Sequence, residues 1–424
     1  MSAKYQPNNS DHDPAKSEDY TCCNNHDLTD HENITDKKLL IICHSYNNFQ
    51  KDSIEGLSRY CKEINVLVRT NPFAEISNYL PVPQLEGFKR SYKIDLLHTP
   101  LNINVIPTPL WYLPGNRFYK FIGAKHFNAV DKMIQHQHLT FDIIHTHFTW
   151  SAGYAGARLK ENYNVPLVVT AHGYDIYSLP FKDNEWQNKI KYVLNTADHI
   201  ITVSQSNLAC IKKLNISTPV TIIPNGFRTD FFYPHDSSEC RKMLNLPQDK
   251  KIILTVGNLE PVKGQTHLIE AVTKIMQDRE NILCVIVGTG KLRTAFECQI
   301  RSLGLENSII LAGGKLHNEI PLWMNACDVF VLPSLNEGNP TVMFEALGCG
   351  KPFVGTKVGG VPEVITSDEY GLLVDPADPE DLAEKILVAL DREWDREKIL
   401  RYAERFTWEN IVREIVSVYK QVLR

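Results

Sequence analysis

The sequence predicts an α/β protein built from two doubly wound domains, and three observations support this prediction. The chain has 424 residues, a length that suits two domains of roughly 180 residues better than one core. Short apolar runs alternate with helical stretches, as expected for parallel strands buried between layers of helices. The same pattern restarts after residue 230, so we expect two open sheets joined near residues 225–234.

Continuous apolar runs mark the expected strands of both domains, because strands covered on both faces have no polar side to expose. In the first domain these runs are residues 39–43, 64–68, 103–107, 142–147, 166–171, 200–204 and 220–224. In the second domain they are residues 252–256, 283–288, 308–313, 329–334, 352–356 and 371–375. Sheets of this kind bind ligands at the carboxyl ends of their strands, so we expect the site between the two domains.

The chain divides into four expected segments. Residues 1–35 are polar and contain almost no aliphatic side chains, which predicts a disordered tail. Residues 36–230 and 231–405 are the expected N-terminal and C-terminal domains. Residues 406–424 have the periodicity of an amphipathic helix that Thr407 would cap, and we expect this helix to pack back on the N-terminal domain.

Composition excludes several classes of function. A formal net charge of -5 gives no general attraction to nucleic acid, so we expect no nucleic-acid partner. The cysteines lack the spacing of a metal site, which is typical of reduced thiols in the cytoplasm. No apolar run approaches about 18 residues, and the chain begins with polar residues. We therefore expect a cytoplasmic protein, with peripheral contact to the inner face of a membrane as an open alternative.

The most informative stretch, residues 333–365, carries two carboxylates eight positions apart, Glu337 and Glu345. Glu337 follows a buried strand and precedes a helix that Pro340 would start. The N–H groups and the dipole of that helix N-terminus suit a diphosphate. Glu345 lies further along the helix, where one carboxylate can accept hydrogen bonds from two ribose hydroxyls.

Each glutamate also has an ordinary interpretation. Glu337 alone could be a solvated loop acid, and Glu345 alone could be a surface charge on a helix. Their context favours a site, because a strand, a glycine-containing loop and a proline-started helix follow one another in order. A second glycine pair, Gly359-Gly360, also lies between a predicted strand and a predicted helix.

This stretch resembles glycosyltransferase family 4, the retaining enzymes of the GT-B fold, in which two Rossmann-like domains face each other across a cleft. The resemblance rests on the pattern S-x-x-E-G-x-P…E-A-x-x-x-G-x-P-x-V-x-T-x-x-G-G-x-P-E, which contains Glu337 and Glu345. It includes residues 256–264, the sequence VGTGKL at 287–292 and the ending FTWENI. Residues 140–424 match well, and residues 36–139 match only in general pattern.

The resemblance implies a donor site for a nucleotide sugar in the C-terminal domain. Lys263 corresponds to a lysine that neutralises the departing diphosphate, in a loop that also contains Gly257. Asn258 replaces the arginine usual in that loop, which leaves more of the charge compensation to Lys263. Glu337 corresponds to a contact with the donor sugar, and Glu345 to the ribose anchor.

Main-chain groups after Glu337 are also implied as ligands. Gly338, Asn339 and Thr341 can offer backbone N–H groups to the sugar and the phosphates. Pro340 is a weaker candidate, because proline has no N–H group.

The N-terminal domain contributes a histidine by the same resemblance. His172 follows the predicted strand at 166–171 and corresponds to an active-site histidine above the donor sugar. Asp175 is a candidate to support it, and His145 and His147 would lie beside the same cleft. A hydrogen-bonded histidine in the core is the alternative for each of the three histidines.

The implied reaction needs neither a metal nor a cofactor. Family members lack an obvious carboxylate nucleophile, and front-face substitution assisted by the leaving phosphate is the usual proposal for them. We therefore expect neither Glu337 nor Glu345 to act as a nucleophile. A D-x-D motif is absent from the segments expected to fold, so no metal site is predicted.

The acceptor side is far less informative. Many relatives have a Gly-Gly loop after the first strand, but residues 43–56 contain no such pair. Aromatic and basic residues interleave within residues 86–127, which could dock on anionic lipid and so reach a lipid-linked acceptor. A core helix with a solvated basic face explains the same residues.

The predicted function is transfer of a sugar from a nucleoside-diphosphate sugar to a saccharide or lipid-linked acceptor. A protein that binds nucleotide sugars without catalysis is one alternative, and a GT-B epimerase acting on the sugar nucleotide is another. The donor base, the sugar, the linkage and the oligomeric state stay open at this stage.

Overall fold

The computed structural model describes residues 34–76, 85, 88–112 and 119–424, and residues 34–424 belong to one compact unit. The tail predicted for residues 1–35 lies outside the described residues, except at its end. There Ile34 is buried in the core, so the folded part begins before the predicted boundary. Residues 86–87 and 113–118 of the aromatic and basic stretch also lie outside.

The first sheet has seven parallel strands in the order β3-β2-β1-β4-β5-β6-β7. Each strand coincides with one of the predicted apolar runs to within a few residues. The strands are β1 (Lys38–Cys43), β2 (Glu63–Thr70), β3 (Ile103–Pro109), β4 (Ile143–His147), β5 (Leu167–Ala171), β6 (His199–Thr202) and β7 (Val220–Ile222).

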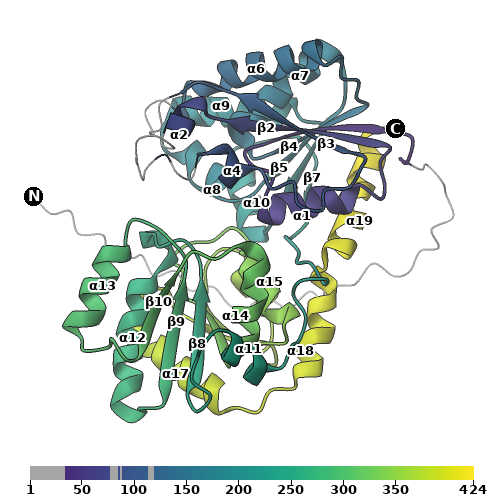
Figure 1. Ribbon diagram of the computed structural model, residues 1–424. Coiled ribbons are helices and arrows are strands. Elements are labelled where there is room, and N and C mark those ends of the chain that lie inside the picture. The colour runs from purple at the N-terminus through teal and green to yellow at the C-terminus, as the bar shows by residue number, and fades with distance from the viewer. Residues whose placement is uncertain (1–33, 77–84, 86–87, 113–118) are drawn as a thin grey trace, which may run out of the picture. The chain divides into compact units, whose positions relative to one another are not determined.

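Helices cover both faces of this sheet. Successive residues of a strand point to opposite faces. Accordingly, Leu40 and Ile42 pack with α6, α7 and α9, whereas Leu39 and Ile41 pack with α1. Figure 1 shows α6 and α7 on the opposite side of the sheet from α1. The helical elements are α1 (Asn48–Leu57), α2 (Pro72–Glu75), α4 (Arg90–Lys93), α6 (Ile122–His136), η2 (Thr149–Gly153), α7 (Tyr154–Tyr163), α8 (Tyr174–Tyr177), η3 (Leu179–Phe181), α9 (Asn184–Thr196) and α10 (Gln205–Lys212).

The second sheet has six parallel strands in the order β10-β9-β8-β11-β12-β13. These strands also coincide with the predicted runs, so the predicted α/β class with two doubly wound sheets is confirmed. They are β8 (Lys251–Val256), β9 (Ile282–Val287), β10 (Ile309–Gly313), β11 (Val329–Leu332), β12 (Phe353–Thr356) and β13 (Gly371–Val374).

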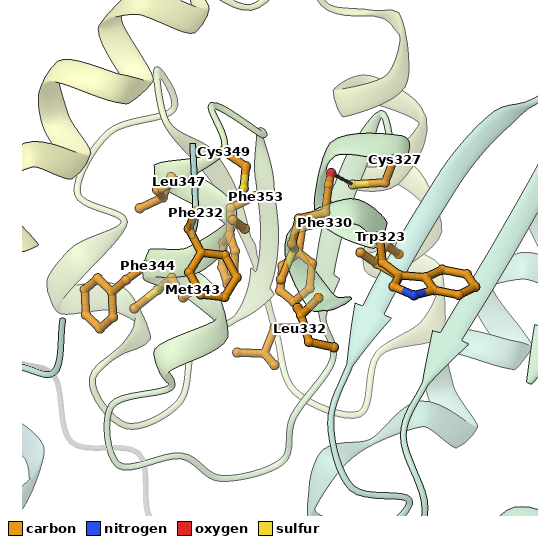
Figure 2. Packing of buried hydrophobic residues seen from close by; sticks show 14 of the residues in the cluster. Phe232, Trp323, Cys327, Phe330, Leu332, Met343, Phe344, Leu347, Cys349 and Phe353 are labelled. Atoms are coloured by element: carbon orange, nitrogen blue, oxygen red, sulfur yellow. Dashed lines mark hydrogen bonds between the residues drawn. The ribbon is translucent and has the colours of Figure 1, made fainter. Parts of the chain in front are cut away.

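The second sheet is also packed on both faces. Helices α12, α13 and α17 cover one face, and α14, α15 and α18 cover the other. Figure 2 shows that the second face is rich in aromatic side chains, with Phe330 and Phe353 from the strands and Phe344 from α15. The helical elements are α11 (Ser237–Met243), η4 (Pro261–Lys263), α12 (Gln265–Asp278), α13 (Arg293–Ser302), η5 (His317–Glu319), α14 (Ile320–Ala326), α15 (Thr341–Gly348), α16 (Val361–Val364), α17 (Pro379–Asp391), α18 (Arg396–Ala403), η6 (Glu404–Phe406) and α19 (Trp408–Val422).

The last helix, α19, belongs to the core of the first sheet. Thr407 caps it by accepting a hydrogen bond from the Asn410 N–H, as the sequence predicts. Its apolar face, which includes Val412 and Val416, packs with β1 and β2. The Tyr419 hydroxyl lies 2.6 Å from Nδ1 of His145 in β4. The helix thus covers the same face of the sheet as α1.

Both sheets change direction beside their first strands. Strand order reverses between β1 and β4 in the first sheet and between β8 and β11 in the second. Loops that follow strands at such a switch point diverge and leave room for a ligand. The predicted residues Lys263 and Glu337 follow β8 and β11, so they lie at the switch point of the second sheet. Within the described residues, no helix is both long and apolar enough to cross a membrane.

Replacement of Phe353 by alanine tests the packing of the aromatic core. The side chain is fully buried against Phe330, with ring centroids 6.0 Å apart. We expect Phe353→Ala to lower the free energy of unfolding by about 3–5 kcal/mol, measured by urea denaturation. Phe121 is 65% exposed, so Phe121→Ala should change it by less than about 0.5 kcal/mol. Equal losses in the two variants would contradict this packing.

Candidate active site

An ion pair occupies the switch point of the second sheet. Lys263 Nζ lies 2.6 Å from Oε1 of Glu337, and the Ser334 hydroxyl donates to the same oxygen at 2.6 Å. Glu337 is only 8% exposed, and a buried carboxylate is tolerated only with such partners. The structure therefore brings together the two residues predicted to contact the donor phosphates and the donor sugar.

Glycines allow three loops, those after β8, β11 and β12, to lie close together around this ion pair. Gly264 has a φ of 64°, and a Cβ atom there would lie 2.0 Å from the Pro333 carbonyl oxygen. Gly359 has a φ of 54°, and its Cβ would lie 1.8 Å from the Glu337 carbonyl oxygen. Any other residue at either position would push the loops apart. The Gly359-Gly360 pair singled out in the sequence thus supports the backbone under Glu337.

A third glycine connects this loop to the predicted histidine. A Cβ atom at Gly338 would lie 2.2 Å from the carbonyl oxygen of His172. The Gly338 carbonyl in turn accepts a hydrogen bond from the Gly360 N–H at 2.9 Å. The loop after β11 and the loop after β5 are therefore in backbone contact, which places His172 beside the Glu337 loop.

The helix after the loop begins at Thr341, with Pro340 as its N-cap. The first N–H groups of a helix have no partner within it, so those of Thr341 and Val342 can bind an anion. The side-chain oxygen of Asn339 already has a partner, because it accepts a hydrogen bond from the Asn225 N–H at 2.8 Å. The Asn225 side chain also donates to the Asn339 carbonyl at 2.7 Å. These bonds occupy the two oxygens of Asn339, so its N–H groups are what it can offer to a ligand.

The loop after β8 presents two further predicted residues. The Gly257 N–H donates to the Val287 carbonyl at 3.0 Å, so this amide continues the sheet and does not point to a ligand. Asn258 has an exposed side chain, and its carbonyl accepts from the Gln265 side chain at 3.0 Å. Asn258 therefore keeps a side chain that can reach a ligand, whereas Gly257 shapes the loop.

Glu345 makes a contact that the sequence did not predict. Its Oε1 lies 3.0 Å from Nε2 of His317, and the carboxylate is 5% exposed. Burial tends to lower the pKa of His317, but the hydrogen bond and charge of Glu345, with the charge of Asp52, raise it above 6.5. The two residues are 28 positions apart, and no motif links them. A ribose would therefore meet a carboxylate that already has a cationic partner.

Further carboxylates surround this pair. Asp52 and Glu55 on α1 lie 3.6 Å and 3.3 Å from Nη1 of Arg228, in the segment that connects the two sheets. Burial raises the pKa of Asp52 to about 7, although His317 and Arg228 act in the opposite direction. Sequence patterns gave no signal for this cluster, because its members are far apart in the chain.

His172 contacts a second predicted histidine. Its Nε2 lies 3.0 Å from Nδ1 of His147, and the two rings stack with centroids 5.2 Å apart. Burial, followed by the charge of His147, lowers the pKa of His172 well below 6.5. His172 is therefore neutral at physiological pH and suited to a hydrogen bond with a sugar hydroxyl.

Asp175 fixes the backbone around His172. Its carboxylate accepts from the N–H groups of Thr149 at 2.7 Å, Gly173 at 2.8 Å and His172 at 3.2 Å. The side chain is 2% exposed. Asp175 is thus a positioning residue that ties the loops after β4 and β5 together.

His145 has the hydrogen bonds of a core histidine, which is the alternative that the sequence left open. Its Nδ1 lies 2.6 Å from the Tyr419 hydroxyl, and its Nε2 lies 2.7 Å from Oγ1 of Thr170. The ring is fully buried, and both nitrogens have partners. Successive strand residues alternate between faces, so His145 and His147 share a face, with ring centroids 4.8 Å apart. His145 therefore connects the sheet to α19.

Among the residues that the structure describes, no group of three or more His, Cys, Asp or Glu side chains could hold a metal ion. Lys263 is the cation nearest Glu337. Positive charge for a diphosphate is thus available from this lysine and from the N-terminus of α15.

Two family models match the chain. The one described as Glycosyltransferase Family 4 matches residues 89–231, and the one described as Glycosyl transferases group 1 matches residues 236–406. An uncharacterised glycosyltransferase of Methanocaldococcus jannaschii is 30% identical over 286 residues, which cover 66% of this chain and 76% of that protein. The chain belongs to glycosyltransferase family 4. Membership supports glycosyl transfer from a nucleotide sugar as the activity of this enzyme.

Other relatives of this family 4 glycosyltransferase have more specific names. D-inositol 3-phosphate glycosyltransferase of Acidothermus cellulolyticus is 28% identical over 342 residues, covering 76% of each protein. A putative teichuronic acid biosynthesis glycosyltransferase of Bacillus subtilis is 30% identical over 276 residues, covering 65% of this chain and 68% of the relative. The relatives differ in product, so the family alone does not give an acceptor.

Solved structures show the GT-B fold for this family 4 glycosyltransferase. Sucrose-phosphate synthase of Thermosynechococcus elongatus superposes with a TM-score of 0.73 at 23% identity, covering 91% of this chain and 99% of the synthase. Anabaena HepE in complex with UDP and glucose superposes with a TM-score of 0.70 at 22% identity, covering 91% and 99%. The predicted GT-B fold is confirmed.

The pKa of His317 tests its contact with Glu345. In Glu345→Gln the carboxylate charge is lost and burial dominates, so we expect the pKa of His317 to fall below 6.5 from its raised value. NMR titration of the ring measures both values. Glu337→Gln, which leaves the His317 contact intact, is the control.

The stability of the protein should follow the same titration. The pKa of His317 is higher in the folded than in the unfolded protein, so its contact with Glu345 stabilises the fold when the ring is protonated. This stabilisation is complete below about pH 6.5 and is lost as the pH rises through the folded-state pKa. An unchanged pKa of His317 in Glu345→Gln would disprove the assigned contact.

Proposed function

We propose that this enzyme is a retaining glycosyltransferase that moves a sugar from a nucleoside-diphosphate sugar to a saccharide or lipid-linked acceptor. The observation that carries the proposal is the meeting of three features at one loop. The Lys263–Glu337 ion pair, the N-terminus of α15 and His172 all border Gly338.

The donor diphosphate would bind at Lys263 and the N-terminus of α15. An ammonium and unpaired backbone N–H groups stabilise the charge that develops as the nucleotide departs. The diphosphate would compete with Glu337 for Lys263, and Glu337 could then turn its carboxylate to the sugar hydroxyls. HepE, which shares the fold, has been solved with UDP-glucose, consistent with a donor of this class.

Front-face substitution is the mechanism that these side chains support best. A double displacement needs a carboxylate able to attack the anomeric carbon. Asp175 accepts three backbone hydrogen bonds, and Glu337, once the diphosphate takes Lys263, would bind the sugar hydroxyls. Both carboxylates then serve to position groups, which favours attack by the acceptor on the face that the nucleotide leaves.

Atoms and charge balance in this reaction without a further reactant. The bond between the anomeric carbon and the diphosphate oxygen breaks, and a bond to the acceptor oxygen forms on the same face. The acceptor proton passes to the leaving phosphate oxygen. Lys263 neutralises the charge on the diphosphate, and His172 orients a hydroxyl of the donor sugar.

We propose that the reaction needs no metal and no cofactor, since Lys263 and the helix N-terminus supply the charge that a metal would otherwise provide. Turnover should therefore persist in the presence of EDTA. A requirement for added divalent cation would overturn this part of the proposal.

Membrane contact through residues 86–127 stays a prediction. The stretch contains exposed apolar side chains, among them Leu101, Trp111 and Phe121. Lys120 pairs with Asp183 at 2.7 Å and Glu185 at 3.2 Å, so its charge is compensated within the protein. Helix α6 has a buried face and an exposed face that includes Lys125, as a core helix with a solvated side would.

A panel of nucleotide sugars tests the proposed function. Nucleotide release that an acceptor stimulates, with retention at the anomeric carbon seen by NMR, supports the proposal. Binding without turnover would indicate a non-catalytic protein, and an isomerised donor would indicate an epimerase. An inverted product would overturn the mechanism but not the transfer.

Removal of the Lys263 ammonium should slow catalysis. We expect Lys263→Ala to lower kcat by about 10²-fold or more, because charge on the leaving diphosphate loses its counter-charge. Initial rates of nucleotide release measure the effect. Lys291→Ala removes a lysine that pairs with Glu260 at a 65% exposed position, and it should retain full activity. Equal rates for the two variants would exclude the assigned role.

Replacement of His172 should separate catalysis from nucleotide binding. We expect His172→Ala to lower kcat at least about tenfold while the affinity for the free nucleotide changes little, because the imidazole faces the sugar and not the base. Initial rates and calorimetric titration measure the two quantities. His136→Ala, at an exposed position on α6, is the matched control. A larger loss in nucleotide affinity than in kcat would contradict the assignment.

A further inference from the structure

Two cationic side chains are buried together in the first domain, outside the residues that the proposed mechanism uses. Arg69 lies near the carboxyl end of β2 and is 5% exposed, and Lys93 ends α4 and is 7% exposed. Lys93 Nζ donates to the Arg69 carbonyl at 3.2 Å. The Arg69 guanidinium lies 5.4 Å from the Tyr112 ring and 5.8 Å from the Tyr119 ring.

No carboxylate compensates these charges in the described part of the chain. Neither residue forms a salt bridge there, and Arg69 Nε has no hydrogen-bond partner. Burial, followed by the charge of Arg69, lowers the pKa of Lys93 to about 7. Two adjacent buried cations without an anion are a costly arrangement, which an anionic ligand would relieve.

Neighbouring residues hold Arg69 in place. Its Nη1 donates to the Ser151 hydroxyl oxygen at 2.8 Å, and that oxygen lies 2.9 Å from Nδ1 of His126. Burial lowers the pKa of His126 to about 3, with the charge of Arg69 acting in the same direction. The neutral His126 ring can therefore accept a hydrogen bond from the Ser151 hydroxyl, whose oxygen in turn accepts one from Arg69.

This cluster lies next to His172 along the edge of the sheet. Strands β2, β1, β4 and β5 are neighbours, and Arg69, His44, Phe148 and His172 lie at or just beyond their carboxyl ends. The His44 ring stacks on Phe148 with centroids 4.9 Å apart, and Phe148 lies 4.7 Å from the His172 ring. The Ser151 N–H also donates to His44 Nε2 at 3.3 Å.

We propose that Arg69 and Lys93 bind a phosphate group of the acceptor. Binding there would place an acceptor hydroxyl beside His172, where it can reach the anomeric carbon of the donor sugar. An arginine and a lysine side by side match the double negative charge and the several oxygens of a phosphate ester better than a single carboxylate. The proposal rests on the proposed function, because it names the acceptor class for the same site. His44 lies between this cluster and His172, after β1, in contact with both Ser151 and Phe148.

Inorganic sulfate tests the anion site without any turnover. The experiment uses the full chain with Lys263→Ala, which removes the cation of the donor site, and compares melting temperatures at matched ionic strength. We expect sulfate to raise the melting temperature by about 2–4 °C. Adding Arg69→Gln or Lys93→Met should abolish the shift, and Arg59→Gln, at an exposed position, should keep it.

Lys93→Met keeps the test decisive if Arg69→Gln fails to fold. An apolar side chain of similar length removes a buried charge, so the variant should be at least as stable as the parent. A merely structural role for Lys93 predicts lost stability with unchanged sulfate binding, which would overturn the proposal. Failure of the Lys263→Ala parent to respond to sulfate would overturn it as well.

Matched acceptors test the assigned substrate class. With a donor that supports turnover, glucose 6-phosphate, glucuronate and glucose are compared as acceptors. We expect the phosphate ester to have the highest kcat/KM and to lose at least tenfold in Arg69→Gln. Glucuronate as the best acceptor would indicate a carboxylate ligand, and equal use of glucose would overturn the acceptor assignment. If no donor supports turnover, the proposed function fails, and the sulfate measurement still decides the anion site.

Discussion

The burial of Glu337 is the constraint on which the proposed donor site depends. A carboxylate at this depth needs a cation and a hydroxyl, and Lys263 and Ser334 provide them from the loops after β8 and β11. Those two loops can approach each other only because Gly264 has no side chain, and the loop after β12 can approach the Glu337 backbone only because Gly359 has none. The ion pair and the glycines therefore specify one another, and together they set the position of the helix N-terminus that would receive a diphosphate.

Much of the fold follows from local sequence. Strands such as β1 and β9 are continuous apolar runs, which is the pattern expected of strands covered on both faces. The Thr407 cap and the start of α15 were also predictable, because capping depends on neighbouring residues. The proposed donor site could be located in the sequence for the same reason, since Glu337 and Glu345 belong to one continuous stretch.

The rest could not be predicted, because the partners are distant in sequence. His317 meets Glu345 across 28 positions, and Arg69 meets Ser151 across 82. No periodicity relates such pairs, and a lone histidine or arginine carries no information about its partner. His145 is a further example, since its partner Tyr419 lies 274 positions away on the C-terminal helix.

The position of helix α19 at the end of the chain affects how the protein folds during its synthesis. Its residues complete the core beside β1 and β2, and a Cβ atom at Gly56 on α1 would lie 2.7 Å from Val412. The last strand of the first sheet ends at Ile222 and α19 begins only at Trp408, so one apolar face of that sheet stays uncovered while the second domain is made. Such a surface is a binding site for chaperones and a hazard for aggregation during synthesis. The nascent chain closes its first domain only after its second domain has emerged.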